Sequence, residues 1–337
     1  MQESSPANQV EQEFKMEKHK LGKTNLMVTP LCWGCAPLGN MPDTFGYEVS
    51  TEQARKTVLA AFNGAGGGSV NFFDTANNYG DSESRIGESL KIRGGLPDGC
   101  IIATKADRDP KTNEFTASRM RESVIKSLER LGIGKLPLVY LHDPEKHPRY
   151  LTDRTGATQE MLAENGPVAE LQKLRDEGVI QHLGISGGPI DLLKEFVETG
   201  RFDVVITHNR WNLIYQTAES LFTAAQKRNM GIVNAAPFGS GLLAEGNTTG
   251  RFAYKAPSEE IKRRTAEIKR ICQQYNVPIT AVALQFSFRD TRIHSTVVGI
   301  TDPKQIEENL RLLKIPIPDQ LWIDIKEYAI TEGDPES

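Results

Sequence analysis

Short apolar segments alternate with longer amphipathic segments along most of the chain. The short segments are rich in β-branched and aromatic residues, as strands are, and the longer ones carry apolar residues at helical spacing. Such an alternation predicts a parallel sheet covered by helices. The expected strands span residues 30–35, 70–73, 101–104, 138–141, 180–185, 204–206, 231–235 and 296–298. The expected helices span residues 52–62, 84–91, 118–131, 166–177, 190–198, 216–228, 259–275 and 279–288.

Eight expected strands, with a helix after nearly every one, favour a closed barrel over an open sheet. An open doubly wound sheet is usually marked by a glycine-rich turn after its first strand, and residues 34–39 do not have that pattern. A turn signal between two short extended segments at residues 19–28 predicts a small β-hairpin before the barrel. We therefore expect the α/β class, with a (β/α)8 (TIM) barrel after a short N-terminal β-hairpin.

The 337 residues show no repeat, low-complexity tract or linker that would divide the chain. We expect a disordered tail over residues 1–17, a single barrel domain over residues 18–330 and a C-terminal tail over residues 331–337. The 38% hydrophobic content is enough for a sizeable core. The 40 basic and 44 acidic residues give a net charge of −4, which argues against a nucleic-acid partner.

The composition also bears on the compartment. No segment reaches the roughly 18 consecutive apolar residues of a membrane span, and the first 20 residues lack the apolar run of a secretory signal. The four cysteines are too few and too scattered for a disulfide framework. We expect a cytoplasmic protein without a membrane partner, as a monomer or a small homo-oligomer.

Two short motifs resemble known chemical signatures and are better explained structurally. Cys32 and Cys35 match the C-x-x-C pattern, but this spacing in a strand puts the side chains on opposite faces, and no second ligand pair accompanies them. We expect no metal site. Residues 239–244 match G-x-G-x-x-A, yet only one expected strand follows, too few for a Rossmann unit. A glycine-rich loop that lies along a cofactor stays open as an alternative.

Four polar residues stand at the carboxyl ends of three consecutive expected strands. Asp74, Lys105 and His142 each follow one strand, and Tyr79 lies five residues after Asp74. Barrel enzymes place their chemistry at this end of the barrel. A free tyrosine is a poor acid at neutral pH, and an adjacent lysine would lower its pKa by favouring the phenolate. The aspartate would hold the lysine, and a neutral histidine would orient a substrate oxygen.

These groups can move a proton to or from a carbonyl or alcohol oxygen, but none of them can supply a hydride. In these residues and the segments around them, the chain resembles the aldo-keto reductases over about residues 18–330. The matching motifs are the D-T-A-x-x-Y-G segment within residues 74–87 and the pairs Thr104-Lys105 and Leu141-His142. The resemblance implies a catalytic tetrad of Asp74, Tyr79, Lys105 and His142.

The resemblance further implies that NAD or NADP lies extended across the top of the barrel without a Rossmann domain. It places the nicotinamide carboxamide near residues 184–187, the pyrophosphate near residues 236–243 and the adenosine half near residues 298–310. The implied cofactor-binding residues are Gly34, Cys35, Asp74, Ser186, Gly187, His208, Pro237, Phe238, Gly239, Ser240, Gly241, Leu242, Gly299, Thr301, Gln305, Glu308 and Asn309.

Shorter segments resemble the aldose and pyridoxal dehydrogenases of this superfamily. That likeness implies a sugar or other polar carbonyl compound as the small-molecule substrate, oxidised at C1 to a lactone with Tyr79 as general base. Two alternatives are an NAD(P)H-dependent aldehyde or ketone reductase and a non-catalytic cofactor-binding interaction protein. Three positions depart from the family pattern: His208 stands where many members have glutamine, Ala235 stands where an aromatic residue often stacks on the nicotinamide, and Gln305 replaces the arginine with which many NADPH-preferring members bind the 2′-phosphate. We expect NAD preference or dual use.

Overall fold

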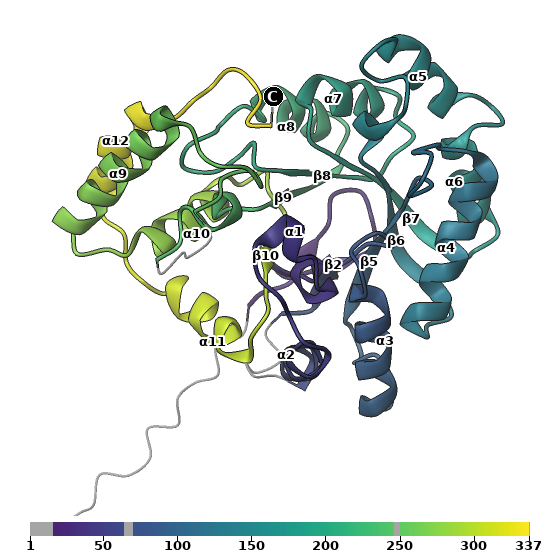
Figure 1. Cartoon of the computed structure of the whole chain (residues 1–337), viewed down its shortest axis with the longest axis horizontal. Helices are drawn as coiled ribbons and strands as arrows, with labels where there is room; N and C mark the ends of the chain where they lie inside the picture. The colour runs from purple at the N-terminus through teal and green to yellow at the C-terminus, as the bar shows by residue number, and fades with distance from the viewer. Residues whose placement is uncertain (1–15, 64–69, 246–249, 337) are drawn as a thin grey trace, which may run out of the picture.

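Eight parallel strands close into a barrel in the computed structural model, which describes residues 16–63, 70–245 and 250–336 (Figure 1). The strand order around the barrel is β10-β3-β4-β5-β6-β7-β8-β9, so each strand lies beside its neighbour in sequence. The expected (β/α)8 barrel is confirmed. Its strands are β3 (Leu31–Gly34), β4 (Phe72–Asp74), β5 (Ile101–Ala106), β6 (Leu136–His142), β7 (Ile180–Gly187), β8 (Val204–His208), β9 (Gly231–Ala235) and β10 (Ser295–Gly299).

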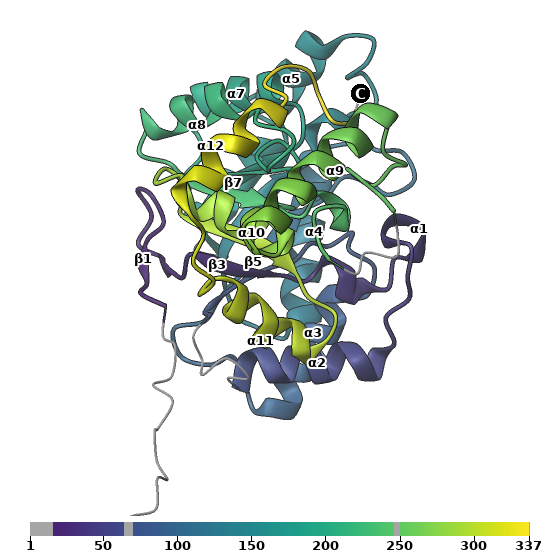
Figure 2. The same cartoon turned by 90° about the vertical axis from the view of Figure 1, so that its left-hand side faces the viewer.

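Helices cover the outside of the barrel (Figures 1 and 2). Neighbouring pairs pack together, among them α2 with α3, α4 with α6 and α7 with α8. All eight expected helices are present. Their bounds are α2 (Thr51–Asn63), α3 (Ser82–Arg93), α4 (Ala117–Leu131), α6 (Pro167–Asp176), α7 (Ile190–Glu198), α8 (Glu219–Gln226), α9 (Glu259–Gln274) and α10 (Ile279–Arg289). None of the described helices is long and apolar enough to cross a membrane.

Four α-helices were not expected from the sequence: α1 (Pro42–Phe45), α5 (Arg154–Leu162), α11 (Pro303–Leu312) and α12 (Asp319–Ile325). The helices α1 and α11 begin with proline, which fits the first turn of a helix but interrupts a periodic pattern. The helix α5 lies in a polar segment that resembles a loop.

The predicted hairpin closes the amino-terminal end of the barrel. Its strands β1 (His19–Lys20) and β2 (Met27–Val28) pair antiparallel, with His19 opposite Val28. Leu21, Leu26 and Val28 pack into the same cluster as the inward-facing Phe72 of β4. The hairpin therefore supplies the lowest layer of side chains in a barrel interior that is filled by side chains.

Residues along β3 alternate between the barrel interior and the helix layer. Cys32 belongs to the inner cluster, whereas Leu31, Trp33 and Cys35 pack in the outer one. Both cysteines are free and buried. No group of side chains in the described part of the chain could hold a metal ion.

The expected N-terminal tail lies outside the described residues, apart from Met16, which is buried, and Glu17. The chain after residue 330 is described up to Glu336. The division of the chain at residues 17 and 330 stays a prediction.

A close backbone contact positions the loop that carries Tyr79. The N–H of Asp81 donates to the carbonyl of Gly39 at 3.0 Å, and Gly80 has a left-handed φ of 51°. A Cβ atom on Gly39 would lie 1.8 Å from the carbonyl oxygen of Tyr79. Only glycine at position 39 allows the two loops to approach this closely.

We expect G39A to lower the free energy of unfolding by about 1–3 kcal/mol and to displace Tyr79, because backbone atoms cannot rotate out of the way. The matched control is G134A, since a Cβ atom on Gly134 meets nothing within 4 Å. Chemical denaturation measures both. If G39A and G134A are equally stable, the close approach of Gly39 to the backbone of Tyr79 does not position the loop.

Candidate active site

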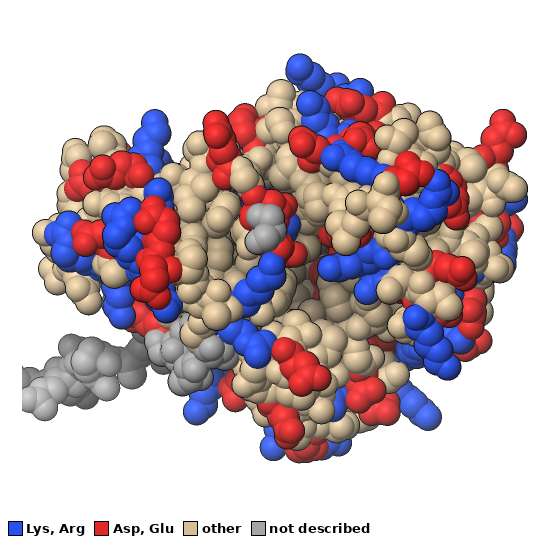
Figure 3. Space-filling model, turned by 45° about the horizontal axis from the view of Figure 1, so that its top comes forward, with Lys and Arg blue, Asp and Glu red and all other residues tan. Residues whose placement is uncertain are grey.

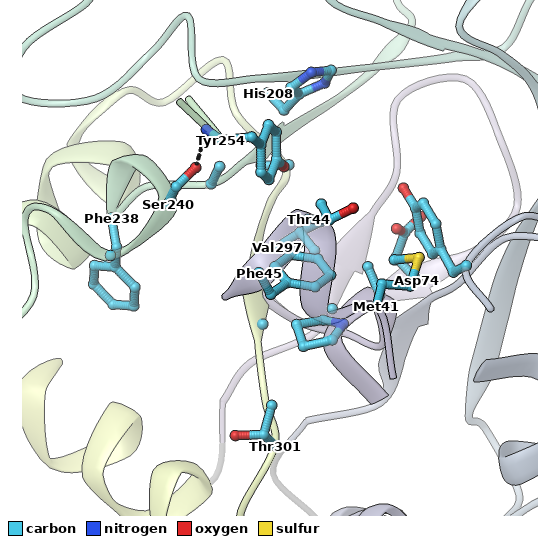
Figure 4. A pocket seen from close by; sticks show the side chains of 18 of the residues that line it. Met41, Thr44, Phe45, Asp74, His208, Phe238, Ser240, Tyr254, Val297 and Thr301 are labelled. Carbon is cyan, nitrogen blue, oxygen red and sulfur yellow. Dashed lines mark hydrogen bonds between the residues drawn. The ribbon is translucent and has the colours of Figure 1, made fainter. Parts of the chain in front are cut away.

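A cleft of about 470 Å³ opens at the carboxyl ends of the barrel strands (Figure 4). This volume lies in the range of small-molecule and cofactor sites. The cleft brings together most of the residues that the sequence analysis singled out. Those that line it are Gly34, Asp74, Tyr79, Lys105, His142, Ser186, His208, Pro237, Phe238, Ser240, Gly241, Gly299, Thr301 and Gln305.

The remaining candidates are not among the lining residues of the cleft: Cys35, Gly187, Gly239, Leu242, Glu308 and Asn309. Cys35 is 1% exposed within the outer core. Glu308 pairs with Arg311 at 2.7 Å. A Cβ atom on Gly239 would lie 2.5 Å from the ring of Phe252, so glycine at this position allows the loop to pack against that ring. Cofactor contacts for these residues therefore gain no support from the geometry.

A buried ion pair forms the floor of the cleft. The Lys105 ammonium donates to Oδ2 of Asp74 at 2.6 Å and to the carbonyl of Thr75 at 2.8 Å. The side chains of Lys105 and Asp74 are 1% and 7% exposed. Asp74 ends β4 and Lys105 lies near the end of the adjacent β5, which brings the charges together. The predicted contact between the two residues is present.

Tyr79 lies against this pair. The ammonium of Lys105 is 4.6 Å from the centroid of the Tyr79 ring. Burial, and secondarily the charges of Asp74 and Asp143, raise the pKa of the phenol well above its usual value. The lowering effect expected from Lys105 does not outweigh burial in this structure, where the ammonium is bound to the Asp74 carboxylate.

His142, the last residue of β6, stands between two carboxylates. Its Nδ1 is 2.6 Å from Oδ1 of Asp107, and its Nε2 is 3.5 Å from Oδ1 of Asp143. The His142 and Tyr79 rings meet edge to face, with centroids 5.5 Å apart. Burial would lower the pKa of His142, but the nearby charges of Asp143 and Asp107 outweigh it, and the pKa is raised.

Sequence reasoning missed Asp107 and Asp143 as members of this site. Asp107 follows β5 two residues after Lys105, so strand alternation turns both side chains to the same side. The spacing of two residues from Lys105 could therefore have identified Asp107 as a site residue from the sequence. Asp143 directly follows His142 and has a φ of 48°, which is rare for a residue other than glycine and is often found at functional sites.

The C-terminal segment adds two carboxylates beside the mouth of the cleft. Glu336 contacts Nε2 of His208 at 3.0 Å and Nη1 of Arg210 at 2.7 Å. Asp334 binds the same guanidinium, which is 1% exposed. Because its ring is held by Glu336, His208 is less free to hold a nicotinamide carboxamide than the sequence alone implies. Tyr254 lies beside His208, with ring centroids 6.1 Å apart (Figure 4).

The family model for the aldo/keto reductase family matches residues 30–330. The chain belongs to this family. It is similar to D-threo-aldose 1-dehydrogenase of a Pseudomonas species, 31% identical over 90% of this chain and 95% of that protein. It is also similar to L-galactose dehydrogenase of Arabidopsis thaliana, 32% identical over 88% of each chain.

Pyridoxal 4-dehydrogenase of Microbacterium luteolum is 28% identical to the chain, over 93% of this chain and 98% of that protein. Among solved structures, an aldo-keto reductase from Bacillus halodurans has a TM-score of 0.71 at 20% identity, covering 94% of this chain and 97% of that one. This structure supports the fold. Family and relatives together identify the chain as an NAD(P)-dependent oxidoreductase.

The residues of the cleft fit such a dinucleotide. Gly34, Gly241 and Gly299 line the cleft, and a Cβ atom on Gly34 would lie 2.9 Å from the side chain of Val297. Ser240 and Gly241, with φ values of 58° and 98°, line the cleft after β9. Elsewhere in the cleft, Oδ1 of Asp74 is buried and lacks a hydrogen-bond partner among the described residues.

The side chain of Gln305 caps the start of a helix at one end of the cleft. Its Oε1 accepts hydrogen bonds from the backbone N–H of Thr301 at 2.7 Å and of Asp302 at 3.3 Å. With Asp302 it forms a capping box at the start of α11. The amide therefore stabilises the helix terminus that lies at the cleft, and it presents no positive charge there.

Proposed function

We propose that the protein oxidises the C1 hydroxyl group of a cyclic aldose to a lactone, with NAD(P)⁺ as hydride acceptor. The observation that carries this proposal is the convergence of Tyr79, Lys105, Asp74 and His142 at one cleft floor. The relatives with 31% and 32% identity are named as an aldose and a galactose dehydrogenase. A bound nicotinamide ring would accept a hydride in its oxidised form and donate one in its reduced form.

Side chains of the protein would transfer the proton of the C1 hydroxyl group. Tyr79 would take the proton of the C1 hydroxyl during oxidation, and return it to the carbonyl oxygen in the reverse direction. His142 would hydrogen-bond the same oxygen through Nε2. Lys105 and Asp74 would hold the ring of Tyr79 against the reacting oxygen. Ser186, Gly241 and the other lining residues named above would hold the cofactor.

The walls of the cleft favour a neutral, hydroxyl-rich substrate. Asp143 lines the cleft and its carboxylate can accept hydrogen bonds from sugar hydroxyls. Glu145 lies close by, and burial and the charge of Asp143 raise its pKa to about 7. Phe45 and Tyr47 line the rim and offer flat apolar faces. An anionic sugar would meet like charge at Asp143.

A second candidate is a reductase of small aldehydes. It is favoured by the raised pKa of Tyr79, because a neutral phenol is ready to donate a proton to a carbonyl oxygen. Turnover of aldoses, pyridoxal and simple alcohols with NAD⁺ and NADP⁺, set beside turnover of aldehydes with the reduced cofactors, separates the two. If aldehydes turn over and no aldose does, the aldehyde reductase replaces our proposal.

We also propose a cytoplasmic protein that is a monomer or a small homo-oligomer. All four cysteines are free thiols, as in reducing compartments. On the face seen in Figure 3, basic and acidic side chains are interspersed rather than gathered by sign. Light scattering on the purified protein gives the oligomeric state.

We expect Y79F to lower kcat on the order of 10²–10⁴-fold, because the phenyl ring fills the same space but cannot exchange a proton. Cofactor affinity, measured by fluorescence titration, should stay within about twofold. The matched control is Y275F on the outer surface, where the hydroxyl binds only Asp324 among the contacts described. Substantial turnover by Y79F would contradict the assignment.

We expect NAD preference or dual use, because Gln305 is neutral and bound to its own helix start. A guanidinium at this position would bind a 2′-phosphate, so Q305R should raise kcat/KM for NADP⁺ relative to NAD⁺ on the order of tenfold. The control Q305E keeps a capping oxygen and should shift the ratio the other way. A hundredfold preference of the wild-type protein for NADP⁺ would contradict the expectation.

A further inference from the structure

We propose that Asp107 is a positioning residue: it fixes the tautomer and orientation of His142 and ties that ring to the loop that carries Tyr79. The inference deepens the proposed function and rests on it. Asp107 follows β5 at the cleft floor and is 1% exposed. Neither the tetrad motif nor the cofactor segments include it.

Both carboxylate oxygens of Asp107 are engaged. Oδ1 lies 2.6 Å from Nδ1 of His142, and Oδ2 accepts the backbone N–H of Asn78 at 3.0 Å. Asn78 directly precedes Tyr79. One carboxylate thus joins the imidazole to the backbone next to the phenol, so that the two groups keep a fixed separation.

The backbone of Asp107 is itself anchored to α4. Its N–H donates to Oγ of Ser123 at 2.9 Å, and its carbonyl accepts Nε of Arg119 at 3.1 Å. Ser123 is fully buried. Contacts on both sides hold the carboxylate rigidly, as a group that orients another side chain requires.

The contact determines the hydrogen positions on His142. An ionised carboxylate only accepts hydrogen bonds, so Nδ1 of His142 must carry its proton there. Nε2 is then the atom left to face the reacting oxygen, as in other sites where a carboxylate orients a histidine. The groups that face the ring are Asp107, Asp143 directly after β6, Lys105 from β5 and Tyr79 from its loop.

The carboxylates favour the imidazolium and Lys105 opposes it, with a raised pKa of His142 as the net result. Because the raised pKa keeps the ring in its imidazolium form to a higher pH, Nε2 of His142 can donate a hydrogen bond over a wider pH range than in an unperturbed histidine. Loss of the Asp107 charge should therefore lower the pKa of His142, and the donor form should be lost at a lower pH.

The test is D107N, with D109N as the matched control. Asp109 lies two residues further on, and its carboxylate accepts hydrogen bonds from the backbone N–H groups of Lys111 and Thr112 in a local turn. In D107N two donors, Nδ1–H of His142 and the Asn78 N–H, meet a side chain with one acceptor oxygen. We expect kcat/KM to fall on the order of 10–100-fold. The affinity for the cofactor should not change, and the pH dependence of kcat/KM should shift to lower pH.

An NMR titration of the His142 ring supplies a readout that does not depend on turnover, with H142Q giving the assignment. We expect the wild-type neutral ring to carry its proton on Nδ1, and the pKa of His142 to fall by about one pH unit or more in D107N and to stay in D109N. A neutral ring protonated on Nε2 in the wild-type protein would overturn the inference, even if D107N does not fold. An unchanged pKa in folded D107N would overturn it too.

The two proposals fail in different ways. If no aldose is turned over while the NMR results hold, the proposed function fails and the positioning of His142 stands. If aldoses are turned over and D107N matches the wild-type protein in its pH profile, Asp107 is only a structural support for the Asn78 loop and the inference fails.

Discussion

The ion pair between Lys105 and Asp74 is the interaction on which the site depends. An ammonium that is 1% exposed is strongly destabilised unless an opposite charge and hydrogen-bond acceptors surround it. Asp74 and the carbonyl of Thr75 supply both. Because these partners lie at the ends of neighbouring strands, closing the barrel is what assembles them. The charge pair therefore depends on the closed barrel.

A second carboxylate contact parallels the first on the other side of Tyr79. Asp74 holds an ammonium and Asp107 holds an imidazole, both at 2.6 Å. The phenol lies between these two pairs, and its own loop is fixed by Gly39 and by the Asn78 N–H. The groups that we propose to react come from β4, β5, β6 and one loop. Their relative positions are set by buried contacts, which is how a site is kept ready for a transition state.

The sequence predicted the strands well because buried parallel strands carry short apolar runs, and all eight lie where the runs lie. Tyr79, Lys105, Asp74 and His142 were identifiable as strand-end residues for the same reason. Short helices such as α1 escaped prediction, since four residues carry no periodicity. Asp107 escaped because no motif contains it and only the folded barrel brings it to His142. The phenol's pKa was misjudged, because the burial and the Asp74 charge that raise it depend on packing.

We propose that Tyr79 is a neutral phenol whose proton state controls both directions of the reaction. The most direct test is the pH dependence of kcat/KM for oxidation and reduction by the same preparation. Oxidation needs the phenolate, so its rate should keep rising with pH from about pH 6 to about pH 9 without a plateau, while reduction should fall only as His142 loses its proton. An oxidation rate that levels off near pH 7 would show a lowered phenol pKa and contradict the account.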